Sequence, residues 1–97
     1  MPPIIHVGPK VTDENGYLEL TTKVVNEYTC YMLVNIISYV EDNVDTEFDF
    51  SHYEVYKGEV LLENLNVPIE DGVYFVKVTD SSGNTATLQV THTNLEE

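Results

Sequence analysis

The stretch that decides the fold reads Glu70-Asp71-Gly72-Val73-Tyr74-Phe75-Val76-Lys77-Val78-Thr79-Asp80-Ser81-Ser82-Gly83-Asn84-Thr85-Ala86-Thr87-Leu88-Gln89-Val90. Two runs of alternating character flank a Ser-Gly-Asn turn, which is the pattern of a β-hairpin with one buried face. The alternation predicts two sets of inward side chains that face one another across the hairpin. These sets are Tyr74, Val76 and Val78 on the first strand and Ala86, Leu88 and Val90 on the second.

Upstream of this hairpin, further runs have strand character and no run is a convincing helix. Turn signals such as Asn15-Gly16 and Lys57-Gly58 separate them at intervals of about 8–12 residues, the spacing typical of a β-sandwich. The most apolar run, Tyr31–Val40, is long enough for a helix, but its Val, Ile and Tyr content favours a strand. The predicted strands before the hairpin are Ile4–Val7, Tyr17–Val25, Tyr31–Val40, Phe48–Tyr56 and Glu59–Leu65.

The length and composition set the domain count and the fold class. The chain has 97 residues, of which 42% are hydrophobic, which is enough for one core. We therefore expect a single domain spanning residues 1–97. Its predicted class is all-β, an antiparallel sandwich of about seven strands.

The start of the hairpin resembles the tyrosine corner of immunoglobulin-like domains. In that motif an acidic residue precedes a Gly or Ala, then a Tyr, then the second Cys of the domain. Glu70, Gly72 and Tyr74 occupy the first three of these positions, and Val76 occupies the fourth. The resemblance implies an inward Tyr74 ring whose hydroxyl bonds the backbone just upstream.

The residues that depart from that pattern indicate which kind of immunoglobulin-like domain the chain resembles. Val76 replaces the second Cys, Cys30 is the single cysteine, and the chain has no Trp. It is therefore similar to the disulfide-free immunoglobulin-like modules of bacteria and bacteriophages, including the small accessory proteins that decorate phage capsids. Cys30 itself is interpreted as a small buried hydrophobe.

The charge of the chain excludes several classes of partner. It has 17 acidic residues and four Lys but no Arg, for a formal net charge of −13 at pH 7. Nucleic acids and anionic membranes should therefore repel it, whereas a basic protein surface or a cation would attract it. The start lacks the basic and apolar regions of a secretion signal, and no apolar run approaches the ~20 residues of a membrane span.

No arrangement of residues carries a recognisable catalytic signature. His6, His52 and His92 fall on three separate predicted strands without further ligands at metal-binding spacing. Cys30 has no Cys-His signature around it. We therefore expect no enzymatic activity and no catalytic or metal-binding residues.

Calcium is the one cofactor with some support. The Glu41–Asp49 loop concentrates the hard oxygen ligands that Ca²⁺ prefers, but it lacks the residue order of an EF-hand. We interpret it as a solvated acidic loop and keep Ca²⁺ as the alternative. The candidate ligands are Glu41, Asp42, Asn43, Asp45, Glu47 and Asp49.

The resemblance implies a function that is exercised through surfaces. We expect a non-enzymatic auxiliary subunit of a bacteriophage virion, assembled in the host cytoplasm and present in many copies on a capsid, neck or tail protein. A different class, an adhesive or carbohydrate-binding module of a bacterial surface protein, is the alternative. The candidate contacts are an edge strand with Pro2, Pro3, Ile4 and Ile5, and three tyrosines, Tyr28, Tyr53 and Tyr56, which could instead pair across strands within the domain.

Overall fold

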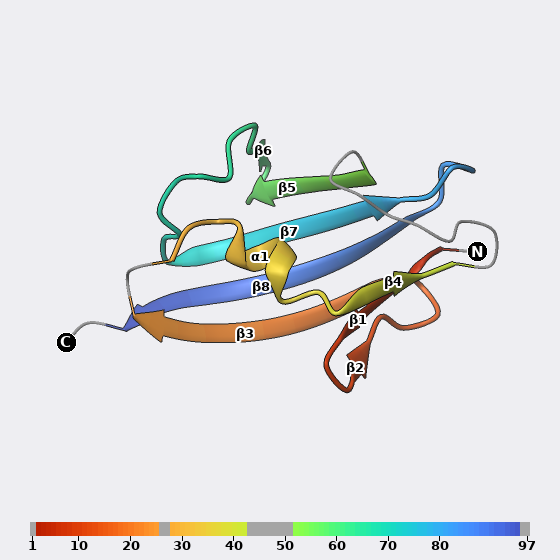
Figure 1. Cartoon of the computed structure of the whole chain (residues 1–97), viewed down its shortest axis with the longest axis horizontal. Coiled ribbons are helices and arrows are strands. Elements are labelled where there is room, and N and C mark those ends of the chain that lie inside the picture. Colours follow the sequence, from red (N-terminus) through yellow and green to blue (C-terminus); the bar gives the residue numbers. More distant parts are fainter. Residues whose placement is uncertain (1, 26–27, 43–51, 96–97) are drawn as a thin grey trace.

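The computed structural model describes residues 2–25, 28–42 and 52–95, and this part of the chain is mostly β-structure in two sheets (Figure 1). The smaller sheet has the strand order β2-β1-β4, and the larger has the order β3-β8-β7-β5-β6. The elements are β1 (Ile4–Val7), β2 (Lys10–Val11), β3 (Tyr17–Val25), α1 (Met32–Asn35), β4 (Tyr39–Glu41), β5 (Tyr53–Lys57), β6 (Val60–Leu61), β7 (Gly72–Thr79) and β8 (Thr85–Leu95).

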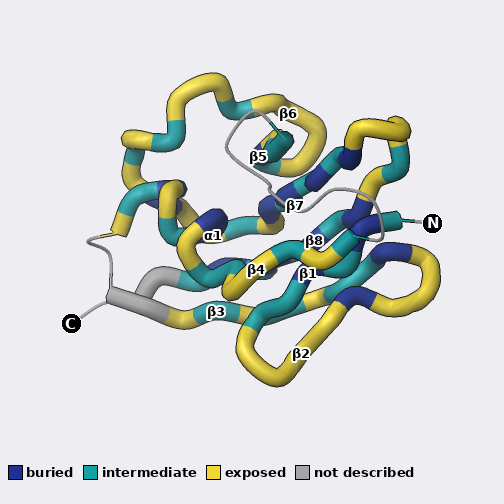
Figure 2. The backbone as a smooth tube through the Cα atoms, turned by 45° about the vertical axis from the view of Figure 1, so that its right-hand side comes forward, coloured by how far each residue is buried: buried dark blue, intermediate teal, exposed yellow. Residues whose placement is uncertain are grey.

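The predicted hairpin is confirmed as β7 and β8. Its inward residues pair across the two strands and are all buried: Tyr74 with Val90, Val76 with Leu88, and Val78 with Ala86. Figure 2 shows this buried character recurring along β7 and β8 and at α1, while the β2 turn is exposed. The alternation in the sequence thus identified the central part of the core.

The turn of the hairpin is closed by an acidic side chain. One carboxylate oxygen of Asp80 accepts hydrogen bonds from the N–H groups of Ser82 and Asn84, both at 2.9 Å. Gly83 follows with a φ of +89°, a value that residues with a Cβ rarely adopt. Asp80 therefore organises the turn, and Gly83 permits its geometry.

β3 pairs with β8 in parallel, from Tyr17 opposite Thr87 to Val25 opposite Leu95. The expectation of a purely antiparallel sandwich was therefore wrong. The two strands are separated by most of the sequence, so no hairpin turn forces them to run in opposite directions. Leu18 and Leu20 still face the core, as their alternation with the exposed Glu19 predicts.

β1 is the central strand of the smaller sheet, with β2 on one side and β4 on the other. The prediction that it forms an edge strand was therefore wrong. Pro3 and Ile5 are buried, and the N–H of Ile5 donates to the hydroxyl of Thr12 (3.1 Å). These two residues belong to the core and cannot serve as partner contacts, whereas Pro2 and Ile4 are half-buried.

The run predicted as the strand Tyr31–Val40 instead forms α1 and the start of β4. The helical turn is closed by the N–H of Asn35 donating to the carbonyl of Tyr31 (3.0 Å). Leu33 and Val34 are both buried, although a strand would place adjacent residues on opposite faces. This run has no clear alternation of apolar and polar residues, so its Val, Ile and Tyr content alone favoured a strand, which is the wrong element here.

The strand predicted over Glu59–Leu65 is shorter than expected and is limited to β6. Of the strand predicted over Phe48–Tyr56, the described part forms β5 from Tyr53 onward. Phe48 and Phe50, which the sequence placed before β5, lie outside the described residues.

The tyrosine corner has the hydrogen bond that the sequence implied. The Tyr74 hydroxyl accepts from the N–H of Glu70 at 3.0 Å, and its ring is buried. Burial raises the pKa of this hydroxyl, which therefore stays neutral at physiological pH. Gly72 starts β7 with a φ of +143°, and the Glu70 carboxylate pairs with the Lys57 ammonium at 2.9 Å. The segment before β7 is thus tied to β5 and to β7 itself.

We expect Tyr74→Phe to lower the free energy of unfolding by about 1 kcal/mol, because the N–H of Glu70 loses its acceptor while the ring stays in place. Denaturant unfolding followed by circular dichroism measures this change. Tyr39→Phe is the matched control, because Tyr39 is 57% exposed and its ring contact with His6 does not need the hydroxyl. Equal stability of both variants would contradict a structural role for the corner.

The Asp80 carboxylate in the hairpin turn should make the stability of the fold depend on pH. Burial by itself would raise the pKa of Asp80, but the N–H groups of Asn84 and Ser82 and the Asn84 side chain lower it below its ordinary value of 3.8. The stability that this carboxylate contributes is therefore complete above that ordinary value and disappears as pH falls through the lowered one.

Asp80→Asn should be less stable than the wild type at neutral pH, and the difference should shrink on acidification. Thermal unfolding of both proteins across the acidic range measures it. Glu59→Gln, at an exposed position, controls for the general effect of removing one negative charge. A difference that is constant with pH would contradict the assignment.

Candidate binding site

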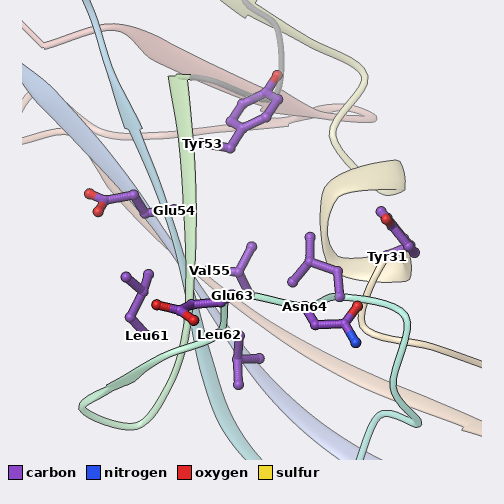
Figure 3. A pocket seen from close by; sticks show the side chains of 9 residues that line it. Tyr31, Tyr53, Glu54, Val55, Leu61, Leu62, Glu63 and Asn64 are labelled. Atoms are coloured by element: carbon purple, nitrogen blue, oxygen red, sulfur yellow. The ribbon is translucent and has the colours of Figure 1, made fainter.

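A pocket of about 490 Å³ opens beside β5, between the chain that follows β6 and the residue that precedes α1 (Figure 3). Its volume falls within the range of ~300–1,000 Å³ typical of ligand sites. Three separate parts of the sequence contribute to it. The lining residues are Tyr31, Tyr53, Glu54, Val55, Leu61, Leu62, Glu63, Asn64 and Leu65.

The pocket exists because β6 is short. β6 pairs only with Tyr56 and Lys57, so within residues 2–25, 28–42 and 52–95 the earlier part of β5 has no strand on that side. The chain makes one more bond to β5, from the N–H of Leu62 to the carbonyl of Val55 (2.8 Å), and then turns away. Asn64 stabilises this departure by accepting a hydrogen bond from the N–H of Asn66 at 3.0 Å.

The pocket combines an apolar base with an exposed, partly acidic rim. Val55 is 3% exposed and forms the base, whereas Leu61 is 43% and Tyr31 is 41% exposed. Figure 3 shows the rings of Tyr31 and Tyr53 on the side of β5 that faces α1, with Glu54 on the opposite side. An apolar group could insert beside the two rings, while a cation or hydroxyl meets the Glu54 carboxylate on the other side of β5.

The described part of the lining presents hydrogen-bonding side chains, and among residues 2–25, 28–42 and 52–95 no His, Cys, Ser or Lys lines this pocket. Its polar groups are the carboxylates of Glu54 and Glu63, the amide of Asn64 and the tyrosine hydroxyls. These groups accept or donate hydrogen bonds to a partner that presents hydroxyl, amide or basic groups.

The interface residues predicted from the sequence do not form one surface. Tyr53 lines the pocket, but Tyr56 faces the other side of the sheet, where it pairs with Phe75. There the Lys77 ammonium lies 5.0 Å from the centre of the Tyr56 ring, beside a second pocket of about 290 Å³. Tyr28 is exposed and lines neither pocket.

Sequence reasoning missed most of the pocket. Leu61, Leu62 and Leu65 were assigned to a regular strand, and Tyr31 was assigned to the strand that is replaced by α1. One signal was available: the run from Val60 to Leu65 does not alternate, which indicates an element that leaves the sheet early.

The three histidines lie in different parts of the fold. The Nε2 of His6 lies 2.9 Å from the Glu41 carboxylate, and its ring stacks on Tyr39 with centroids 4.0 Å apart. His92 is buried, with Nδ1 2.8 Å from the hydroxyl of Thr22, and His52 lies just before β5. Among residues 2–25, 28–42 and 52–95, no cluster of three or more His, Cys, Asp or Glu side chains could hold a metal ion.

The structure also places Cys30 and part of the acidic loop that the sequence suggested as a calcium site. Cys30 is buried, and its burial raises the pKa of the thiol despite a hydrogen bond with Tyr74 that lowers it. In the acidic loop, Glu41 belongs to β4 and Asp42 follows it. The remaining calcium candidates, Asn43, Asp45, Glu47 and Asp49, lie outside the described residues.

Comparison of the chain with protein-family models, curated proteins and solved structures gave no match. Within the described part of the chain, no helix is long and apolar enough to span a bilayer.

The pocket predicts different stability effects at its rim and at its base. Leu61→Ser should change the free energy of unfolding by less than about 0.5 kcal/mol, because the side chain is largely exposed. Val55→Ala should cost about 2 kcal/mol, because it opens a cavity in the core. Chemical denaturation of both variants tests this, and a large cost for Leu61→Ser would mean that the rim serves folding rather than binding.

Proposed function

We propose that this chain is a disulfide-free immunoglobulin-like domain that acts as a non-enzymatic auxiliary subunit of a bacteriophage virion. The observation that carries the proposal is the pocket of exposed tyrosine and leucine side chains in a strongly acidic chain. Such a surface suits protein–protein contact, in which aromatic anchors fill complementary hollows.

The fold supports the immunoglobulin-like assignment at its most specific point. The buried Tyr74 with its bond to the N–H of Glu70 has the arrangement of a tyrosine corner. Two sheets share a core that needs no disulfide, with Cys30 as the single cysteine of the sequence. These features agree with the disulfide-free modules that bacteriophages use.

The proposed mechanism is passive attachment. An apolar side chain of a capsid, neck or tail protein inserts beside Tyr31 and Tyr53, while Leu61 and the Glu54 carboxylate contact that protein from the other side of β5. The net charge of −13 speeds the encounter with a basic surface. A stable contact needs an interface of about 1,000 Å² or more, so the surface around the pocket must take part as well.

The net negative charge also bears on where in the virion the subunit would lie. A chain with 17 acidic residues and four Lys makes no favourable contact with packaged nucleic acid or with an anionic membrane. We therefore place the subunit on the protein shell of the virion, in many copies, after assembly in the host cytoplasm.

A second candidate function follows from the same pocket. Tyrosine rings beside carboxylates and an amide also suit a sugar, whose C–H faces stack on aromatic rings while its hydroxyls bond polar groups. Tyr31, Tyr53, Glu63 and Asn64 offer this combination. An adhesive or carbohydrate-binding module of a bacterial surface protein is therefore the alternative.

The test is saturable binding of the purified chain to purified virion particles from its native source, measured by co-sedimentation. We expect a fixed number of copies per particle and a loss of affinity of at least about tenfold for Leu61→Asp, because the charge would be buried at the contact. Val11→Asp is the matched control, since Val11 is similarly exposed on the other sheet.

No binding to particles, or equal binding by both variants, would overturn the proposal. Binding of an oligosaccharide that quenches tyrosine fluorescence, and that Tyr31→Ala abolishes, would instead support the carbohydrate-binding alternative.

A further inference from the structure

β3 forms an open edge of the larger sheet. It lies at the end of the strand order, and among residues 2–25, 28–42 and 52–95 no strand pairs with its other side (Figure 1). It spans nine residues and contains no proline or glycine. A long, regular edge of this kind is a ready template for another strand.

The backbone hydrogen bonds around the start of β3 show which residues face the open edge. The carbonyl of Gly16 accepts from the N–H of Thr87 on β8 (2.7 Å). The next residue, Tyr17, points both backbone groups away from β8 and bonds Asp13 instead, at 3.0 and 3.1 Å. Because this direction alternates along a strand, every second residue faces the open edge. Beyond Tyr17 these residues include Glu19, Thr21 and Lys23.

The side chains of these three residues make the edge complementary to itself. All three are exposed on the face of the sheet away from the core, with a negative charge and a positive charge placed symmetrically about Thr21. In an antiparallel pair centred on Thr21, Glu19 of each copy lies directly opposite Lys23 of the other. Opposite charges in directly facing positions stabilise a strand pair.

We propose that β3 pairs antiparallel with β3 of a second copy of this chain, with the two-fold axis at Thr21. The two larger sheets then join into one continuous sheet. Each of the pairs Glu19–Lys23, Thr21–Thr21 and Lys23–Glu19 exchanges two backbone hydrogen bonds across the contact. The inference does not depend on the virion function, because it uses only the sheet edge and its charges.

The charges select this register over its neighbours. Sliding one strand by two residues places Glu19 opposite Thr21 or opposite Val25 and removes both ion pairs. Sliding it by four residues places Glu19 opposite Glu19, or Lys23 opposite Lys23, and like charges in facing positions destabilise the pair. The register centred on Thr21 also pairs all three residues beyond Tyr17 whose side chains are complementary, and it leaves the bonds of Tyr17 to Asp13 in place.

The test is sedimentation equilibrium of the full chain from micromolar to millimolar concentration. We expect a reversible monomer–dimer equilibrium with no larger species. Glu19→Lys or Lys23→Glu alone should weaken the dimer by at least about tenfold, because two-fold symmetry turns both ion pairs into like-charge pairs. The double variant Glu19→Lys/Lys23→Glu restores opposite charges and should recover dimerisation.

The control variants distinguish the effect of losing this contact from the general effect of changing the net charge. Glu59→Lys and Lys10→Glu make the same charge changes at exposed positions elsewhere and should leave the dimer unchanged or shift it only slightly. Thr21→Pro removes an N–H that faces the open edge, so it should abolish dimerisation while circular dichroism remains native. A monomeric wild type, larger oligomers, or a double variant that fails to recover would each overturn the proposal.

Discussion

The double pairing of β8 is the constraint on which the larger sheet depends. β8 is the longest strand, and it contacts β3 along one side and β7 along the other. Its inward residues Ala86, Leu88 and Val90 are fully buried between these neighbours. The buried His92 continues the row, and its ring nitrogen meets the hydroxyl of Thr22 on β3. At the start of β7, the Tyr74 hydroxyl holds the preceding segment by accepting from the N–H of Glu70.

The site depends on where this regular pairing stops. β6 is too short to cover β5, so the chain after it leaves the sheet and leucine side chains that would have been strand residues become pocket walls. At the opposite border of the sheet, β3 stays regular to its end, and beyond Tyr17 no strand of the described residues pairs with its outer edge. A partner at the β5 side would therefore be bound mainly through side chains, and a partner at β3 mainly through backbone hydrogen bonds.

The sequence predicted the elements whose pattern is local. β3, β7 and β8 alternate and are bounded by turn residues, so their existence and inward faces could be read directly, whereas β1 was recognised only by the residues that bound it. Met32–Asn35 could not, because an apolar run without alternation fits a helix as well as a strand. The parallel pairing of β3 with β8 leaves no local trace. The pocket joins Tyr31, Tyr53 and Leu61 from three separate segments, and only the three-dimensional structure brings them together.

The parallel contact between β3 and β8 has a consequence for how the chain acquires its structure. Tyr17 meets Gln89 across 72 positions, and Thr22 meets His92 across 70. During synthesis on the ribosome, β3 therefore emerges long before its partner exists. Closing so long a loop is entropically costly, so this pairing should form late and slowly compared with the β7–β8 hairpin. Until then β3 has both edges open, so the nascent chain presents a strand that can pair with other chains for longer than the hairpin does.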